Sequence, residues 1–175
     1  SLILVLLGLL LLFLGKDYLT RLLFPICFLT FMIPLPLVSL ADVSFRLKIL
    51  ASKASVAIVN SLGVTAAREG SVIQTKHSYL ILEDSCSGIN SLIAMIALAT
   101  LMAYYSHMSK PKKIILFLSS VPIPILSNIV RIAALTLVSE IYGVKFATGA
   151  FHEIMGILVF VFAFLGLIMV QNLLE

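Results

Sequence analysis

A cysteine and its neighbours form the segment with the most evident chemistry, Glu83-Asp84-Ser85-Cys86-Ser87-Gly88. The segment lies where a long apolar run begins at Ile89. A helix N-terminus favours the thiolate, which is the form that attacks a carbonyl carbon, whereas a cysteine in the middle of lipid stays a neutral thiol. Cys86 is therefore the candidate nucleophile, and Cys27, inside an apolar run, is the contrasting case.

Two further residues stand where their chemistry is unusual. Arg131 lies inside an apolar run, and His152 lies at the start of another. Charge within a membrane is expensive, so an arginine there marks a functional or a paired site. The structural alternatives are an incidental cysteine, an interfacial histidine and an ion pair between Arg131 and Glu140.

Each candidate has a role available in acyl transfer. His152 can take the proton of Cys86 and return it to a leaving amine. Arg131 can stabilise an oxyanion, or hold a carboxylate or a backbone carbonyl of the substrate. Gly88 would let a substrate backbone approach, and the amides of residues 86–88 would add oxyanion donors. Asn128, on the same helix face as Arg131, can orient a partner by hydrogen bonding.

Composition places the chain in a membrane. Of its 175 residues, 61% are hydrophobic and 11% charged, and the mean hydropathy is +1.18. Apolar runs near the roughly 20 residues that cross a bilayer predict a helical bundle. The net charge of +4 resides in span ends and loops, which favours contact with lipid headgroups over binding of nucleic acid. Zinc-binding spacings are absent, because Gly156 stands where His152-Glu153 would need a second histidine, so we expect neither metal nor cofactor.

The pattern predicts one all-α domain over residues 1–175 with about five spans. The predicted spans are Leu2–Leu14, Leu22 to about Leu40 (kinked or broken by Pro25, Pro34 and Pro36), Ile89 to about Tyr105, Ile114 to about Ile141 (with Pro122 and Pro124 inside it) and Phe151 to about Leu174.

Residues between the second and third spans differ in kind. Asp42–Leu62 predicts an amphipathic helix along lipid headgroups, with Asp42 as N-cap, Gly63 as C-cap, a basic face that includes Arg46 and Lys53, and another face lined by Val43, Leu47, Leu50, Ala54 and Ala57. From Val64 to Glu83, the three short runs Val64–Ala67, Ser71–Thr75 and Tyr79–Leu82 predict a small β-hairpin outside the lipid.

Loop charge brings the three candidates to one side of the membrane. Basic residues in loops 16–21 and 106–113 place both loops in the cytoplasm, and Cys86 then lies outside. Counting the basic residues of the longer segment before Cys86 would give the opposite orientation, but the rule discounts longer translocated segments. The helical rise carries Arg131 about 26 Å from Ile114, to the outer half. His152 follows an outer loop.

An ordered set of motifs resembles the exosortase/archaeosortase family. The set is Leu23-Phe24-Pro25 with Phe31-Met32-Ile33-Pro34-Leu35-Pro36, Gly63-Val64 with Glu69-Gly70, Cys86-Ser87-Gly88-Ile89 with Ser91-Leu92, Pro122-Ile123-Pro124 with Asn128-Ile129-Val130-Arg131-Ile132, and Phe151-His152 with Gly156. Asp84 stands where many exosortases carry glutamate. Members of the family often have additional N-terminal spans, so the complete topology stays open.

The resemblance implies a multi-spanning cysteine protease or transpeptidase of the prokaryotic cell membrane, with its active site on the extracytoplasmic side. It would process surface-protein precursors whose C-terminal tail combines a short motif, a transmembrane helix and a basic cluster. By that resemblance Cys86 is the nucleophile, Arg131 the transition-state or substrate-binding residue and His152 the acid/base. Asp84, Ser87, Gly88 and Asn128 are supporting candidates.

The fate of the acyl-enzyme stays open at this stage. Water, or an acceptor amine on a lipid or glycan, would resolve the thioester. Three alternatives remain: a small transporter with Arg131 as its binding charge, a scaffold that binds the tailed partner without cutting it, and an acyl-transferring membrane enzyme.

Overall fold

The computed structural model describes residues 2–32, 37–82 and 84–175. The chain divides into two compact units, Ser1–Leu37 and Val38–Glu175, and each is described by itself. Pro34, Pro36 and Glu83, all of which figure in the sequence patterns, lie outside the described residues.

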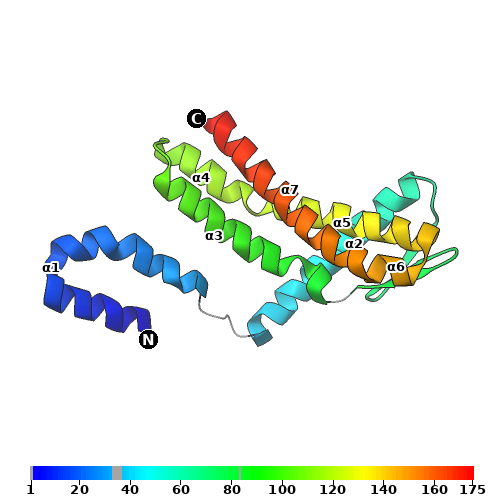
Figure 1. The fold of residues 1–175 in the computed structure, drawn as a ribbon, viewed down its shortest axis with the longest axis horizontal. Helices are drawn as coiled ribbons and strands as arrows, with labels where there is room; N and C mark the ends of the chain where they lie inside the picture. The colour runs from blue at the N-terminus through cyan, green and yellow to red at the C-terminus, as the bar shows by residue number, and fades with distance from the viewer. Residues whose placement is uncertain (1, 33–36, 83) are drawn as a thin grey trace. The chain divides into compact units, whose positions relative to one another are not determined.

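The first unit contains a helix interrupted by a glycine. Helix α1 spans Leu2–Phe28, but Gly15 has φ 78° within it, a conformation that glycine adopts without a steric penalty. The chain direction reverses there (Figure 1). The second half includes Lys16–Arg21, which the hydropathy pattern predicts as a loop.

The predicted second span, Leu22 to about Leu40, is not one helix. Helix α1 continues through Pro25 and ends at Phe28, a 3-10 helix η1 follows over Leu29–Met32, and α2 begins at Leu37. A proline removes one backbone donor without always ending a helix.

Helix α2, Leu37–Ser61, opens the second unit. It begins before Asp42, so the prediction of an N-cap at that residue is wrong. The predicted C-cap is confirmed: Gly63 has φ 89°, the Gly63 N–H donates to Asn60 O at 3.0 Å, and the Val64 N–H donates to Val59 O at 3.3 Å. These two bonds form a Schellman motif.

The packed face of α2 differs from the predicted apolar face. Arg46 and Lys53 are exposed as predicted, but Val43 and Leu50 are exposed as well. The buried positions are Lys48, Ala51, Ser52, Ser55 and Val59. Small residues on this face allow close approach, and the Ser55 hydroxyl donates to the Ile129 O of helix α5 (Pro122–Tyr142) at 2.8 Å.

A three-stranded antiparallel sheet follows, with strand order β1-β2-β3. Its strands are β1 (Ala66–Glu69), β2 (Val72–Thr75) and β3 (Tyr79–Ile81). The second and third predicted runs are confirmed as β2 and β3, whereas β1 begins two residues after the predicted start and extends to Glu69. The predicted hairpin is thus a sheet of three strands. Ile73 and Leu80 on its inner face belong to the same buried cluster as Ile132 and Leu135 of α5. At the β2–β3 turn, the Glu140 carboxylate accepts hydrogen bonds from Thr75 Oγ1 at 2.6 Å and from the His77 amide at 3.1 Å.

The remaining helices form a bundle. They are α3 (Ile89–Tyr105), α4 (Lys110–Ser119), α5 (Pro122–Tyr142), α6 (Val144–Thr148) and α7 (Ala150–Leu174). Helices α5 and α7 lie side by side (Figure 1). The predicted span from Ile114 to about Ile141 lies within the apolar stretch Lys110–Tyr142. It comprises two helices, α4 and α5, because Pro122 is the first residue of a new helix, where its missing N–H costs no bond.

Two stretches of the described chain are long and apolar enough to cross a membrane, Lys110–Tyr142 and Phe151–Leu174. Ile3–Phe13 and Ile89–Tyr105 are apolar but shorter. Large apolar side chains are exposed along α7, including Phe162 at 63% and Leu173 at 75%, as expected of a surface that faces lipid. The protein is therefore a helical membrane protein with a small sheet, and the count of about five spans stays a prediction.

The contacts of Glu140 lead to a prediction about the sheet. Glu140→Ala removes the acceptor for Thr75 Oγ1 and the His77 amide, so it weakens the contact between the β2–β3 turn and α5. We expect faster amide hydrogen exchange over residues 72–82, measured by mass spectrometry. Glu69→Ala, at an exposed position of β1, is the control. Equal exchange in the two variants would show that Glu140 does not hold the sheet on α5.

Candidate functional site

Three elements distant in sequence supply the central side chains. Cys86 lies in the 3-10 helix η2, Asp84–Ser87, Arg131 lies in the middle of α5, and His152 lies in the first turn of α7. Cys86 Sγ is 3.9 Å from His152 Nε2, and Arg131 Nη2 is 2.9 Å from the same nitrogen. The three residues singled out from sequence therefore meet at one imidazole nitrogen.

Arginine fixes the direction of the hydrogen bond to His152. A guanidinium has donors and no acceptor, so His152 Nε2 is the acceptor and carries no proton in this arrangement. Arg131 Nη2 also lies 3.3 Å from His152 O. The Arg131 side chain is thus anchored to both the ring and the backbone of one residue.

A second nitrogen of Arg131 has a different environment. Arg131 is only 8% exposed, and its Nε is buried with no hydrogen-bond partner among the described residues. An unsatisfied buried donor costs about 1–3 kcal/mol. The guanidinium therefore keeps an unused donor within the site.

Asn128 holds the turn that contains Cys86. Asn128 lies on α5, about one helical turn before Arg131. Its Nδ2 donates to Cys86 O at 2.8 Å. Gly88 follows with φ 76°, and a Cβ at that position would lie 3.0 Å from Asn128 Cγ and Nδ2. From the sequence, the missing side chain of Gly88 was expected to let a substrate backbone approach. In the structure, the Asn128 side chain lies where a Gly88 side chain would be.

The other two supporting candidates are less central. Ser87 is buried, and its Oγ accepts a long hydrogen bond of 3.4 Å from the Ile89 amide at the start of α3. Asp84 contributes backbone to η2, but its side chain lies outside the described part of the structure.

An open depression of about 660 Å³ lies beside the imidazole. It is lined by Asn90, Ser91, Arg131, His152, Glu153, Gly156, Ile157 and Phe160. Cys86 is absent from this lining and is 2% exposed. A ligand entering here meets the guanidinium and the imidazole before the thiol.

Most of this lining was not predicted from sequence. On α7, the sequence offers one usable signal, which is the spacing of four residues that puts His152, Gly156 and Phe160 on one helix face. Gly156 has a steric role, because a Cβ there would lie 3.3 Å from Arg131 Nη2. Its lack of a side chain lets α7 accommodate the guanidinium.

Glu140 is not the counter-ion of Arg131. Its carboxylate accepts from Thr75 and His77 instead, and nine residues along a helix separate it from Arg131 by about 14 Å. Among the described residues, no group of three or more His, Cys, Asp or Glu side chains is placed to hold a metal ion.

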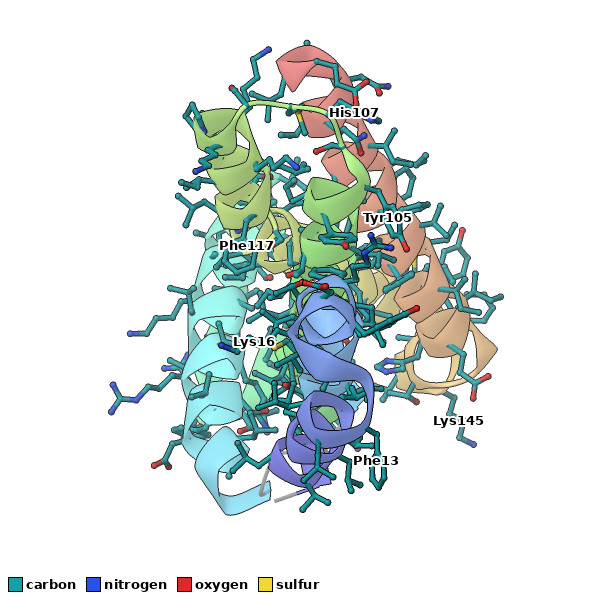
Figure 2. The ribbon with its side chains drawn as sticks, turned by 90° about the vertical axis from the view of Figure 1, so that its left-hand side faces the viewer. Phe13, Lys16, Tyr105, His107, Phe117 and Lys145 are labelled. Atoms are coloured by element: carbon teal, nitrogen blue, oxygen red, sulfur yellow. The ribbon has the colours of Figure 1, made fainter. Side chains whose placement is uncertain are left out.

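Figure 2 shows the two ends of the second unit, with His107 near one and Lys145 of α6 near the other. His152 lies four residues after the end of α6, so the site belongs to the Lys145 end. The basic loop around His107 belongs to the opposite end.

Comparison with known protein families identifies a relationship for this chain. The model of the family described as transmembrane exosortase matches residues 1–169. No curated protein and no solved structure matches the chain.

The contact between Gly88 and Asn128 predicts unequal effects of two glycine substitutions. Gly88 and Gly70 both have positive φ, so alanine costs about 1–2 kcal/mol of backbone strain at either. Only at Gly88 does the new Cβ also meet a neighbour, because nothing lies within 4 Å of a Cβ at Gly70. We expect Gly88→Ala to lower the melting temperature more than Gly70→Ala.

The double variant Gly88→Ala/Asn128→Ala removes the close neighbour. We expect its melting temperature to be higher than that of Gly88→Ala, because the steric contact with Asn128 is gone. The recovery is reduced by loss of the hydrogen bond from Asn128 to Cys86 O. Equal melting temperatures for the two single glycine variants would contradict the role given to the Asn128 contact.

Proposed function

Because the chain belongs to the transmembrane exosortase family, whose members are membrane-embedded sorting transpeptidases, we propose that it cleaves the C-terminal sorting signal of exported surface proteins through a thioester on Cys86. The signal would comprise a short motif, a transmembrane helix and a basic cluster. The observation that carries the proposal is the meeting of Cys86 Sγ and Arg131 Nη2 at His152 Nε2, 3.9 Å and 2.9 Å away.

In the acylation step, the Cys86 thiol passes its proton to His152 Nε2 and the sulfur attacks the scissile carbonyl carbon. The C–S bond forms as the carbonyl π electrons move to oxygen, and Arg131 donates hydrogen bonds to that oxyanion. Collapse of the tetrahedral intermediate breaks the C–N bond. His152 then gives its proton to the departing amine, which carries the transmembrane helix away.

In the second step, water or an amine of a lipid or glycan attacks the thioester. His152 takes a proton from the attacking group, the C–S bond breaks, and the thiol is restored. The open depression beside His152 gives the acceptor a route to the imidazole.

The proposed location is the prokaryotic cell membrane, with about five spans and the site on the extracytoplasmic side. The opposed ends of the second unit support this orientation, because the lysine-rich loop 106–113 and the site belong to different ends (Figure 2). Short basic loops favour the cytoplasm. The chain's sheet packs against the α5 segment that follows Arg131, which keeps the sheet at the same end as the site.

The deciding experiment compares the two cysteines of the chain. Tailed precursors from the same genome are co-expressed with the intact protein, with Cys86→Ala and with Cys27→Ala, and their masses are measured. Cys27 is exposed and lies in the other unit, so it is the matched control. We expect the intact protein and Cys27→Ala to shorten a precursor by its tail, and Cys86→Ala to leave it whole.

Shortening by Cys86→Ala would refute the assignment of the nucleophile. If the intact protein binds a precursor without shortening it, the scaffold alternative is favoured. If the protein binds no precursor and Cys86→Ala behaves like the intact protein in cells, the transporter alternative is favoured.

Substitution of the base gives a second prediction. His152→Gln should lower kcat for precursor cleavage by about 100-fold to 10,000-fold, the usual contribution of a general acid/base. The rate is measured by single-turnover cleavage of purified precursor in nanodiscs. Glu153→Gln, which changes a neighbouring residue of the same depression, is the comparison, and an equal loss in both variants would argue against an acid/base role for His152.

A further inference from the structure

The hydrogen bonds at His152 Nε2 have a consequence for the thiol before substrate arrives. A neutral imidazole presents one acceptor nitrogen, and both Arg131 and Cys86 are directed to it. Arg131 Nη2 is the nearer, at 2.9 Å against 3.9 Å for Cys86 Sγ. Its bond is also charge-assisted, and hydrogen bonds from an ionised donor are about twice as strong as neutral ones.

Arg131 therefore opposes the transfer that activates the thiol. A proton on Nε2 would have to replace the Arg131 hydrogen bond. That replacement lowers the ability of His152 to take the proton of Cys86.

We propose that Arg131 masks His152 at rest, and that an acyl oxygen of the substrate unmasks it by drawing the guanidinium away. Binding of the scissile carbonyl and activation of Cys86 then become one event. This inference rests on the proposed function for the roles of nucleophile and base, and it assigns Arg131 a second role in addition to oxyanion stabilisation.

The burial of the three side chains sets the order of events. Arg131 and His152 line the open depression, whereas Cys86 lies outside its lining and is 2% exposed. An incoming carbonyl oxygen therefore reaches guanidinium donors before its carbon reaches the sulfur. A shift of Arg131 toward that oxygen also gives its buried Nε, which has no partner among the described residues, a chance to donate.

One acidic side chain lines the depression. It is Glu153, which is exposed.

The test measures the thiol without any substrate. The full chain carrying Cys27→Ser is placed in nanodiscs, and the rate at which iodoacetamide alkylates Cys86 is followed by mass spectrometry. The pH runs from about 6 to about 9, which covers the ordinary titrations of imidazole and thiol. Variants are Arg131→Met, His152→Gln and the double substitution.

We expect Arg131→Met to raise the alkylation rate at pH 7 by about tenfold, corresponding to about 1.4 kcal/mol, and to move the rise of the pH profile toward neutrality. The gain should vanish in the double variant, because it requires the imidazole. The same Arg131→Met variant should fail to shorten precursors, since its oxyanion donors are gone. A residue with only a structural role would not combine a faster thiol with lost cleavage.

Phe160→Ala controls for access, because it widens the depression without changing a polar group. An access effect raises the rate equally at every pH and survives His152→Gln. If the Arg131→Met gain behaves in that way, or if Arg131→Met leaves the rate unchanged or lowers it, the masking proposal is wrong. These outcomes are independent of precursor cleavage, so failure of the masking proposal and failure of the proposed function are distinguishable.

Discussion

A guanidinium inside an apolar bundle must find polar partners, and the site is organised by the way Arg131 meets that requirement. Burying a charged side chain that makes no hydrogen bonds has a large free-energy cost. Arg131 satisfies part of its donors with the Nε2 and the backbone oxygen of His152. This pairing needs α7 close to α5 at that level, and Gly156 makes room for it. His152, the proposed acid/base residue, is thus held in place by the guanidinium of Arg131.

Cys86, the proposed nucleophile, is positioned by backbone contacts more than by its own side chain. Asn128 holds Cys86 O, and Gly88 accepts the left-handed conformation that starts α3 against the Asn128 side chain. Leu80 and Leu82, just before the turn, are buried in the same cluster as Cys86, Ile129 and Ile132. The segment after the sheet and helix α5 therefore both pack against the cysteine turn.

A charged residue inside an apolar run was informative in the sequence, because its free-energy cost in lipid indicates a functional or paired site. Arg131 was selected by that reasoning, whereas Cys86 was selected for its place at a predicted helix N-terminus and His152 for its place at the start of a span. The structure brings the three side chains together. The end of α2 was also predictable, since the glycine at position 63 suits a Schellman motif. In contrast, hydropathy did not locate the division of the predicted Ile114–Ile141 span at Pro122. The charged residues 16–21, predicted as a loop, are helical beyond the break at Gly15.

Pairings between distant elements were not predictable from local pattern. The partners of Glu140 depend on the position of the β2–β3 turn relative to α5. From the sequence alone, an ion pair between Glu140 and Arg131 was plausible, but it is wrong. The depression lining has the same origin, because its members come from α3, α5 and α7. Helix faces are readable from spacing, but the choice of which faces meet comes from packing.

Helix α5 makes contacts in sequence order with four separate parts of the unit: Asn128 with the cysteine turn, Ile129 O with α2, Arg131 with α7, and Glu140 with the sheet. Inserting one residue between Asn128 and Glu140 would rotate everything beyond it by about 100° and break the match between those contacts. The length of this segment is consequently under stronger constraint than the identity of its lipid-facing residues, such as Val130. Homologous chains should show no insertions or deletions here, while they can differ in length in the loop between α3 and α4.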